Sequence, residues 1–104
     1  MAGPLNGAAR AVSYTDYVDL EGSAAATLAV SAAADHTPIL NEGIYDVWCT
    51  VDVFVKVAPT ANNVTTANGY LIRANNTVSV LVRTGSRIGA IAGGAGTLSY
   101  HQVL

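Results

Sequence analysis

The sequence predicts an all-β protein: a single-domain, jelly-roll-like β-sandwich of seven to eight short strands with an irregular N-terminal arm. The first observation is that an apolar side chain occupies every odd position from Tyr45 to Val57, the two-residue period of a β-strand. The second is that short segments with this period recur along the chain between turn residues, as in sandwiches and barrels. The third is the length of 104 residues, which suits one core and not two.

The N-terminal residues divide into an arm and a first strand. Residues 1–10 contain two glycines, a proline and an asparagine without any strand or helix period, so we expect an arm that becomes ordered only against a partner. The sandwich domain is predicted to span residues 11–104. Residues 11–20 place Val12, Tyr14, Asp16 and Val18 on one phase and mostly polar side chains on the other, which predicts a strand at a sheet edge.

The segment 23–34 has mixed signals. Its alanines favour a helix, whereas Thr27 and Val30 suit a strand. Because no helix cap and no 3.6-residue apolar stripe is present, we predict a strand with Leu28 and Val30 facing inward. Residues 35–38 are predicted as a loop, and residues 41–43 as a turn.

The long alternating segment exceeds the usual strand length of about five or six residues. We therefore predict a break near residues 50–52, with strands at 44–49 and 51–57. Trp48 and Phe54 lie on the otherwise polar phase, so we expect both sheet faces to be covered in places, as at an oligomer contact. The polar loop Pro59–Asn68 is predicted to be a binding or contact loop.

The C-terminal part predicts strands at 69–73, 77–84, 88–91 and 97–103. The glycine cluster at 93–96 lacks the spacing and the following Lys-Ser/Thr of a phosphate-binding loop, so we interpret it as a hairpin turn. The valines and the single cysteine that share the inward phase form the predicted core: Val47, Cys49, Val51, Val53, Val55, Val78, Val80 and Val82. Cys49 is thus expected to be an inert core thiol.

The composition excludes several classes of function. Charged residues make up 12% of the chain, against roughly 25% in an average domain, so we expect a surface that associates easily. The net charge of −2 and five scattered basic residues argue against nucleic-acid binding. No apolar segment approaches the roughly 20 residues of a membrane span, and the N-terminus lacks a secretory signal, so we expect synthesis in a cytosol.

Residue chemistry predicts no catalytic, cofactor-binding or metal-binding site, and hence no enzyme. His36 beside Asp35, with His101 far downstream, lacks the spacing of a zinc site. Asp46 and Asp52 would lie roughly 20 Å apart on a straight strand, too far to act on one bond. Six aromatic residues could instead line a sugar-binding face, although half of them fall on inward phases: Tyr14, Tyr17, Tyr45, Trp48, Tyr70 and Tyr100.

The last two thirds of the chain resemble small virion proteins encoded in the structural gene clusters of tailed phages and prophages. The resemblance consists of turn and strand pieces at Leu40–Tyr45, Val51–Ala58, Gly69–Ala74, Gly85–Ile91 and Gly96–Tyr100. Proteins of this type are similar to head decoration, or cement, proteins. The resemblance implies a β-sandwich subunit, often trimeric, that is made in the bacterial cytoplasm and binds the major capsid protein on the outside of the virion capsid.

This interpretation predicts a set of partner-binding residues in the arm, at the start of the domain and on the sheet surfaces: Leu5, Arg10, Val12, Trp48 and Phe54. The alternative is a receptor- or glycan-binding knob of a phage head fibre or tail. A solvent-facing cluster of Trp48 with two tyrosines would favour that alternative.

Overall fold

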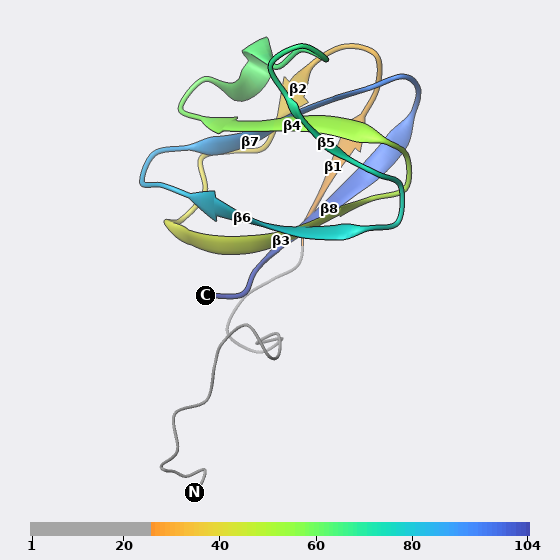
Figure 1. Cartoon of the computed structure of the whole chain (residues 1–104). Coiled ribbons are helices and arrows are strands. Elements are labelled where there is room, and N and C mark those ends of the chain that lie inside the picture. Colours follow the sequence, from red (N-terminus) through yellow and green to blue (C-terminus); the bar gives the residue numbers. More distant parts are fainter. Residues whose placement is uncertain (1–25) are drawn as a thin grey trace, which may run out of the picture.

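The computed structural model describes residues 26–104, with the backbone alone for Asn62, and these residues form eight β-strands and one short 3-10 helix (Figure 1). The elements in chain order are β1 (Ala26–Val30), β2 (Asp35–His36), β3 (Gly43–Cys49), β4 (Val53–Ala58), η1 (Ala61–Asn63), β5 (Tyr70–Ile72), β6 (Thr77–Val82), β7 (Arg87–Ala92) and β8 (Gly96–Gln102). The prediction of an all-β sandwich is therefore confirmed. The predicted arm and the predicted strand at 11–20 lie outside the described residues.

The strands form two four-stranded antiparallel sheets, which Figure 1 shows stacked face to face. The first sheet has the order β1-β8-β3-β6, and the second has the order β2-β7-β4-β5. The pairs β1 with β8, β2 with β7, β3 with β6 and β4 with β5 show that the chain forms one long hairpin that is rolled into two layers. This is the strand order of a jelly roll.

The core lies between the sheets and follows the predicted phases. In β3 and the first half of β4 the inward residues from Tyr45 to Val55 that belong to a strand are buried, and the residues between them are partly exposed. Of the predicted core, five residues are buried and the other three, Val51, Val78 and Val80, are partly buried against them. On β1, Val30 is buried and Leu28 packs partly buried against the core, as predicted.

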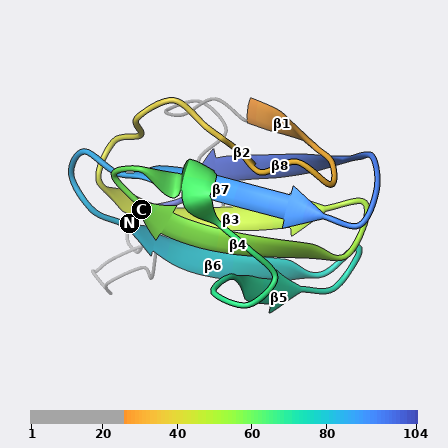
Figure 2. The same cartoon turned by 90° about the horizontal axis from the view of Figure 1, so that it is seen from above.

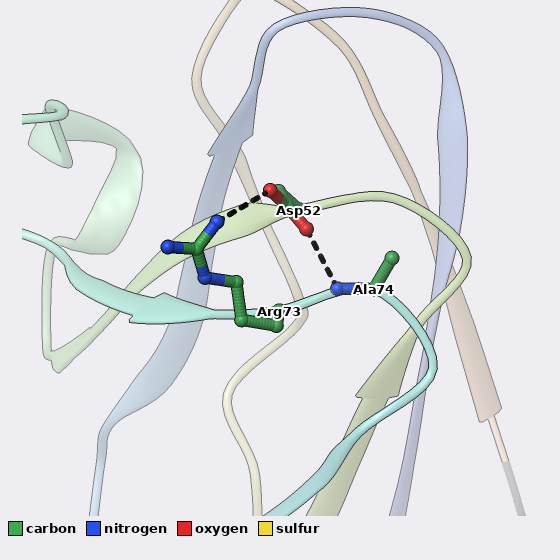
Figure 3. Close-up of polar contacts among 3 residues, drawn as sticks. All are labelled: Asp52, Arg73 and Ala74. Atoms are coloured by element: carbon green, nitrogen blue, oxygen red, sulfur yellow. Dashed lines mark hydrogen bonds and ion pairs between the residues drawn. The ribbon is translucent and has the colours of Figure 1, made fainter.

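The predicted break in the long strand is confirmed, since β3 ends at Cys49 and β4 begins at Val53. There the chain passes from the first sheet to the second, and hydrogen bonds to the β5–β6 turn and to β8 hold the corner. The backbone N–H of Asn75 donates to the carbonyl of Cys49 at 2.8 Å, and that of Thr50 donates to the carbonyl of Thr97 at 3.1 Å. The Asp52 carboxylate accepts a hydrogen bond from the backbone N–H of Ala74 at 2.8 Å (Figure 3).

Two turn predictions were wrong. Asp35 and His36 are not a loop, because they pair with β7 as the short strand β2. The glycine cluster before Gly96 is not a hairpin turn, because β7 belongs to the second sheet and β8 to the first. In a jelly roll this connection crosses from one layer to the other, and strand pairing over long sequence distances leaves no local signal in the sequence.

Candidate functional site

The predicted partner-binding residues do not form one surface. Leu5, Arg10 and Val12 lie outside the described residues. Trp48 lies between two buried residues of β3 and therefore faces outward from the first sheet. Phe54 lies between two buried residues of β4 and faces outward from the second sheet. The two aromatic side chains are both partly buried, and they lie on opposite outer faces of the sandwich.

Phe54 is covered by the loop that follows β4, which the sequence predicted to be a polar contact loop. Within this loop Ala61 and Val64 are buried. A Cβ atom added to Gly69 would lie 2.8 Å from the Phe54 Cβ and 3.1 Å from the Val64 Cγ2. The loop therefore packs directly on β4 at Phe54. The loop after β4 therefore lies over the outer face of the second sheet at this position.

Hydrogen bonds within the same loop give it a fixed shape. The Asn68 side-chain oxygen accepts from the backbone N–H of Thr65 at 2.7 Å, and the Asn68 amide nitrogen donates to the carbonyl of Asn63 at 3.2 Å. The Thr65 hydroxyl oxygen accepts from the backbone N–H groups of Ala67 and Asn68. The loop is thus a compact lid on the second sheet, and its polar composition reflects these internal bonds.

An open groove of about 480 Å³ runs along the side of the sandwich between β6 and β4. β5 has three residues and pairs with Val53–Val55, so the second half of β4 has no neighbour on that side within residues 26–104. β6 pairs with β3 on one side and ends the first sheet. Residues of β4, β5 and β6 and Asn68 line the groove: Val55, Lys56, Val57, Asn68, Tyr70, Val78, Ser79, Val80 and Leu81.

The groove has an apolar floor and two exposed apolar side chains at its rim. Val57, Val78 and Val80 are partly buried against the core. Tyr70 is 64% exposed and Leu81 is 51% exposed. Unlike Trp48 and Phe54, these rim residues are absent from the predicted partner-binding set, although Tyr70 is among the aromatic residues that could line a sugar-binding face. Tyr70 shares the inward phase of Val55, but short β5 lies at the open edge, so its side chain reaches solvent.

A row of polar side chains crosses the outer face of the first sheet. Asp46 lies opposite Ser79 on β6 and His101 on β8, and the Ser79 hydroxyl donates to the Asp46 carboxylate at 2.7 Å. In a catalytic Ser-His-Asp arrangement the imidazole lies between the hydroxyl and the carboxylate. Here the carboxylate holds the middle position, so the row is a cross-strand polar contact and does not activate the hydroxyl as a nucleophile.

The two histidines come from different sheets. The His36 Nδ1 lies 2.8 Å from the carbonyl oxygen of Thr37 and 3.3 Å from the Arg87 Nη1, on β2 of the second sheet, while His101 is on β8 of the first. Among the described residues, no group of three or more His, Cys, Asp or Glu side chains is arranged to hold a metal ion.

The tyrosines that the structure describes divide between core and surface. Tyr45 and Tyr100 are buried in the core, and burial raises the pKa of both phenol groups. The Tyr45 hydroxyl donates to the carbonyl of Asn41 at 2.9 Å. Tyr70 therefore remains as the exposed tyrosine within residues 26–104, and Trp48 has no cluster of exposed tyrosines around it in this part of the chain.

In residues 26–104, no helix combines the length and the apolar character that crossing a bilayer requires. Neither a comparison with models of known protein families nor a search of curated protein sequences found a match to this chain.

Proposed function

We propose that the protein is a bacteriophage capsid decoration, or cement, protein that binds the outside of the assembled head and stabilises contacts between major capsid protein subunits. The resemblance of its last two thirds to small tailed-phage virion proteins supports this proposal. The jelly-roll strand order supports it as well, since viral capsid domains use this architecture. Because one fold serves many functions, a surface that fits the task is also needed.

The observation that carries the proposal is the setting of Trp48 on the outer face of the first sheet. Trp48 lies opposite Thr77 on β6 and Ser99 on β8, and Ser99 lies opposite Thr27 on β1. A large aromatic side chain thus stands in a row of short, uncharged hydroxyl side chains. Aromatic residues on weakly charged surfaces are typical anchors of protein interfaces. We therefore propose that this face docks on the major capsid protein.

The mechanism is mass action. A protein that binds the assembled lattice but not the free capsid subunits stabilises the lattice by about 2.7 kcal/mol per site when its free concentration is 100 times Kd. In this proposal the protein acts as a homo-oligomer, a trimer, on the capsid exterior of the virion after synthesis in the bacterial cytoplasm. The role involves no catalysis, cofactor, nucleic acid or membrane.

The test is co-sedimentation of the purified protein with heads and, separately, with tails from particles whose copy of the gene has been deleted. We expect binding to heads and not to tails. Trp48→Ala should weaken head binding about tenfold, or ~1.4 kcal/mol. Ile39→Ala should leave it unchanged, because Ile39 is exposed in the segment between β2 and β3 and not on this face. Binding to neither particle part would overturn the proposal.

A receptor- or glycan-binding knob of a head fibre or tail is the second candidate, and Tyr70 is the observation that favours it. Its exposed ring borders the groove beside Asn68 and Lys56, and such a ring can stack on a sugar while the polar groups bind hydroxyls. This candidate predicts attachment to purified tails or to host-cell glycans, and loss of that attachment in Tyr70→Ala. Tyr70→Phe is the matched control, because it keeps the ring.

A further inference from the structure

The first sheet ends at β6, whose outer edge has no partner among residues 26–104. The six residues Thr77–Val82 contain no charged side chain and no proline. Natural proteins usually protect such an edge with charges, prolines or bulges, because its unpaired N–H and C=O groups accept a further strand. The apolar floor of the adjoining groove, from Val57, Val78 and Val80, would give that strand side-chain contacts as well.

We infer that residues 11–20 of a second copy of the chain add to this edge as a fifth strand of the first sheet. The inference goes beyond the proposed capsid function and does not depend on it, because the partner is the chain itself. Backbone hydrogen bonds to β6 would supply the affinity, and side chains of alternate residues would enter the groove.

The sequence of residues 11–20 fits this position. Its alternation places Val12, Tyr14, Asp16 and Val18 on one phase. The three apolar members suit the floor of the groove, and Asp16 would enter the groove on the side that Lys56 lines. The other phase includes Ser13 and Thr15, which suits the polar outer face of the first sheet. Ten residues of strand extend about 33 Å and six extend about 20 Å, so the segment is long enough to cover the whole edge of β6.

The charges are complementary. Residues 11–25 contain Asp16, Asp19 and Glu21 and no lysine or arginine. The groove has one charged lining residue, Lys56, and β6 itself is uncharged. An acidic strand therefore meets a basic side chain in the groove and no like charge along β6, which favours this pairing over a strand of neutral sequence.

The position of β1 favours a second copy as the donor. β1 and β6 are opposite edges of the first sheet, as Figure 2 shows. Ala26 lies in line with Tyr100, Val47 and Val78 across the four strands, so three strand spacings of about 4.8 Å separate it from β6. A fifth strand beyond β6 would lie four spacings, or about 19 Å, from β1, and the chain from Leu20 to Ala26 extends at most about 21 Å. This span is too short to pass over the outer side chains, including Trp48, if all ten residues of the donor segment pair with β6, whereas a second copy has no such restriction.

The test is disulfide trapping between full-length variants that each carry one added cysteine. Thr15→Cys lies near the middle of the donor segment, and Ser79→Cys lies near the middle of β6. The native Cys49 is buried, and the wild-type chain shows whether Cys49 by itself forms any disulfide-linked dimer. Mixed in a glutathione buffer, the two variants should form a heterodimer on a non-reducing gel. A disulfide forms only when the two Cα atoms lie within about 7 Å. Ser13→Cys and Tyr17→Cys are therefore tested in parallel, so that a pairing shifted by two residues in either direction along β6 is also detected.

The matched control is Thr15→Cys mixed with Thr66→Cys, since Thr66 is exposed on the loop over the second sheet. We expect at least tenfold more heterodimer with Ser79→Cys than with this control. Equal yields would overturn the inference. A homodimer of Ser79→Cys alone would show that β6 pairs with β6 of another copy, which also overturns it.

The double variant Thr15→Cys/Ser79→Cys separates exchange between copies from pairing within one chain. A disulfide within one chain, together with no heterodimer in the mixture, would show that residues 11–20 add to their own sheet and would overturn the part of the inference that names a second copy. None of these measurements uses a capsid, so their failure is distinct from failure of the proposed function.

Discussion

Ala61 packs directly against Gly89 on the outer face of the second sheet. A Cβ atom added to Gly89 would lie 2.7 Å from both the carbonyl carbon and the Cβ of Ala61. Gly89 is buried in the middle of β7, and Ala61 begins η1. The absence of a side chain at Gly89 therefore allows the loop after β4 to close over this sheet.

Gly89→Ala should destabilise the protein by about 1–3 kcal/mol, because the added methyl group must displace the backbone of η1. Urea denaturation monitored by tryptophan fluorescence measures the change. The matched control is Gly93→Ala: a Cβ there meets no atom within 4 Å, so stability should change by less than about 0.5 kcal/mol. An unchanged midpoint for Gly89→Ala would show that η1 does not pack against β7.

The second prediction concerns the corner at Asp52, where one carboxylate joins two loops (Figure 3). Its bond to the Ala74 backbone N–H should contribute about 1 kcal/mol, so Asp52→Ala should lower the free energy of unfolding by that amount. The ion pair with Arg73 has an N–O distance of 3.3 Å, and the side chains are 52% and 69% exposed. Since exposed ion pairs contribute little, Arg73→Ala should cost less than about 0.5 kcal/mol. Equal losses in the two variants would contradict this assignment.

The third prediction concerns stability at high pH. Burial raises the pKa of Tyr45 and Tyr100 above the ordinary value of 10.0, so the folded chain keeps two protons that the unfolded chain loses. Their contribution to stability is therefore complete below pH 10 and is lost as the pH rises through the folded-state pKa values. The free energy of unfolding should fall above pH 10, and tyrosinate absorbance should rise on unfolding. Tyr100→Phe should make the fall shallower, whereas an unchanged slope would contradict this origin.

The fourth prediction is that burial, and not the size of the side chain, decides the cost of truncation. Val53 is fully buried, whereas the larger Ile39 is 58% exposed. Val53→Ala should cost on the order of 1–3 kcal/mol through lost burial and a cavity, and Ile39→Ala less than about 0.5 kcal/mol. The comparison uses urea midpoints of both variants. A larger loss in Ile39→Ala would mean that Ile39 is covered by a partner in solution.

The sequence predicted the core well because strand alternation is a local property. Val47, Cys49, Val53 and Val55 are buried where the two-residue period placed them. The break between β3 and β4 also followed from length alone, since a strand of fifteen residues would extend beyond a small sandwich.

Features that depend on long-range packing were not predictable in this way. Gly96 pairs with Val30 of β1 in the first sheet, whereas β7 belongs to the second sheet, and nothing near the glycine cluster indicates this. Nothing in the sequence indicates either that the loop after β4 folds back so that Gly69 lies against the Cβ atom of Phe54. The groove is missing from the sequence prediction because it results from the shortness of β5 and from the edge position of β6.

The last prediction separates the arm from the strand that follows it. Deleting residues 1–10 should leave the sandwich folded and the disulfide trapping between Thr15→Cys and Ser79→Cys intact, because residues 11–20 remain. The same deletion should weaken attachment to heads at least fivefold, or about 1 kcal/mol. Leu5 would no longer fill an apolar pocket on the capsid, and Arg10 would no longer pair with an acidic rim. Circular dichroism checks the fold, and co-sedimentation measures attachment. Undiminished attachment would show that the sandwich carries the whole capsid interface.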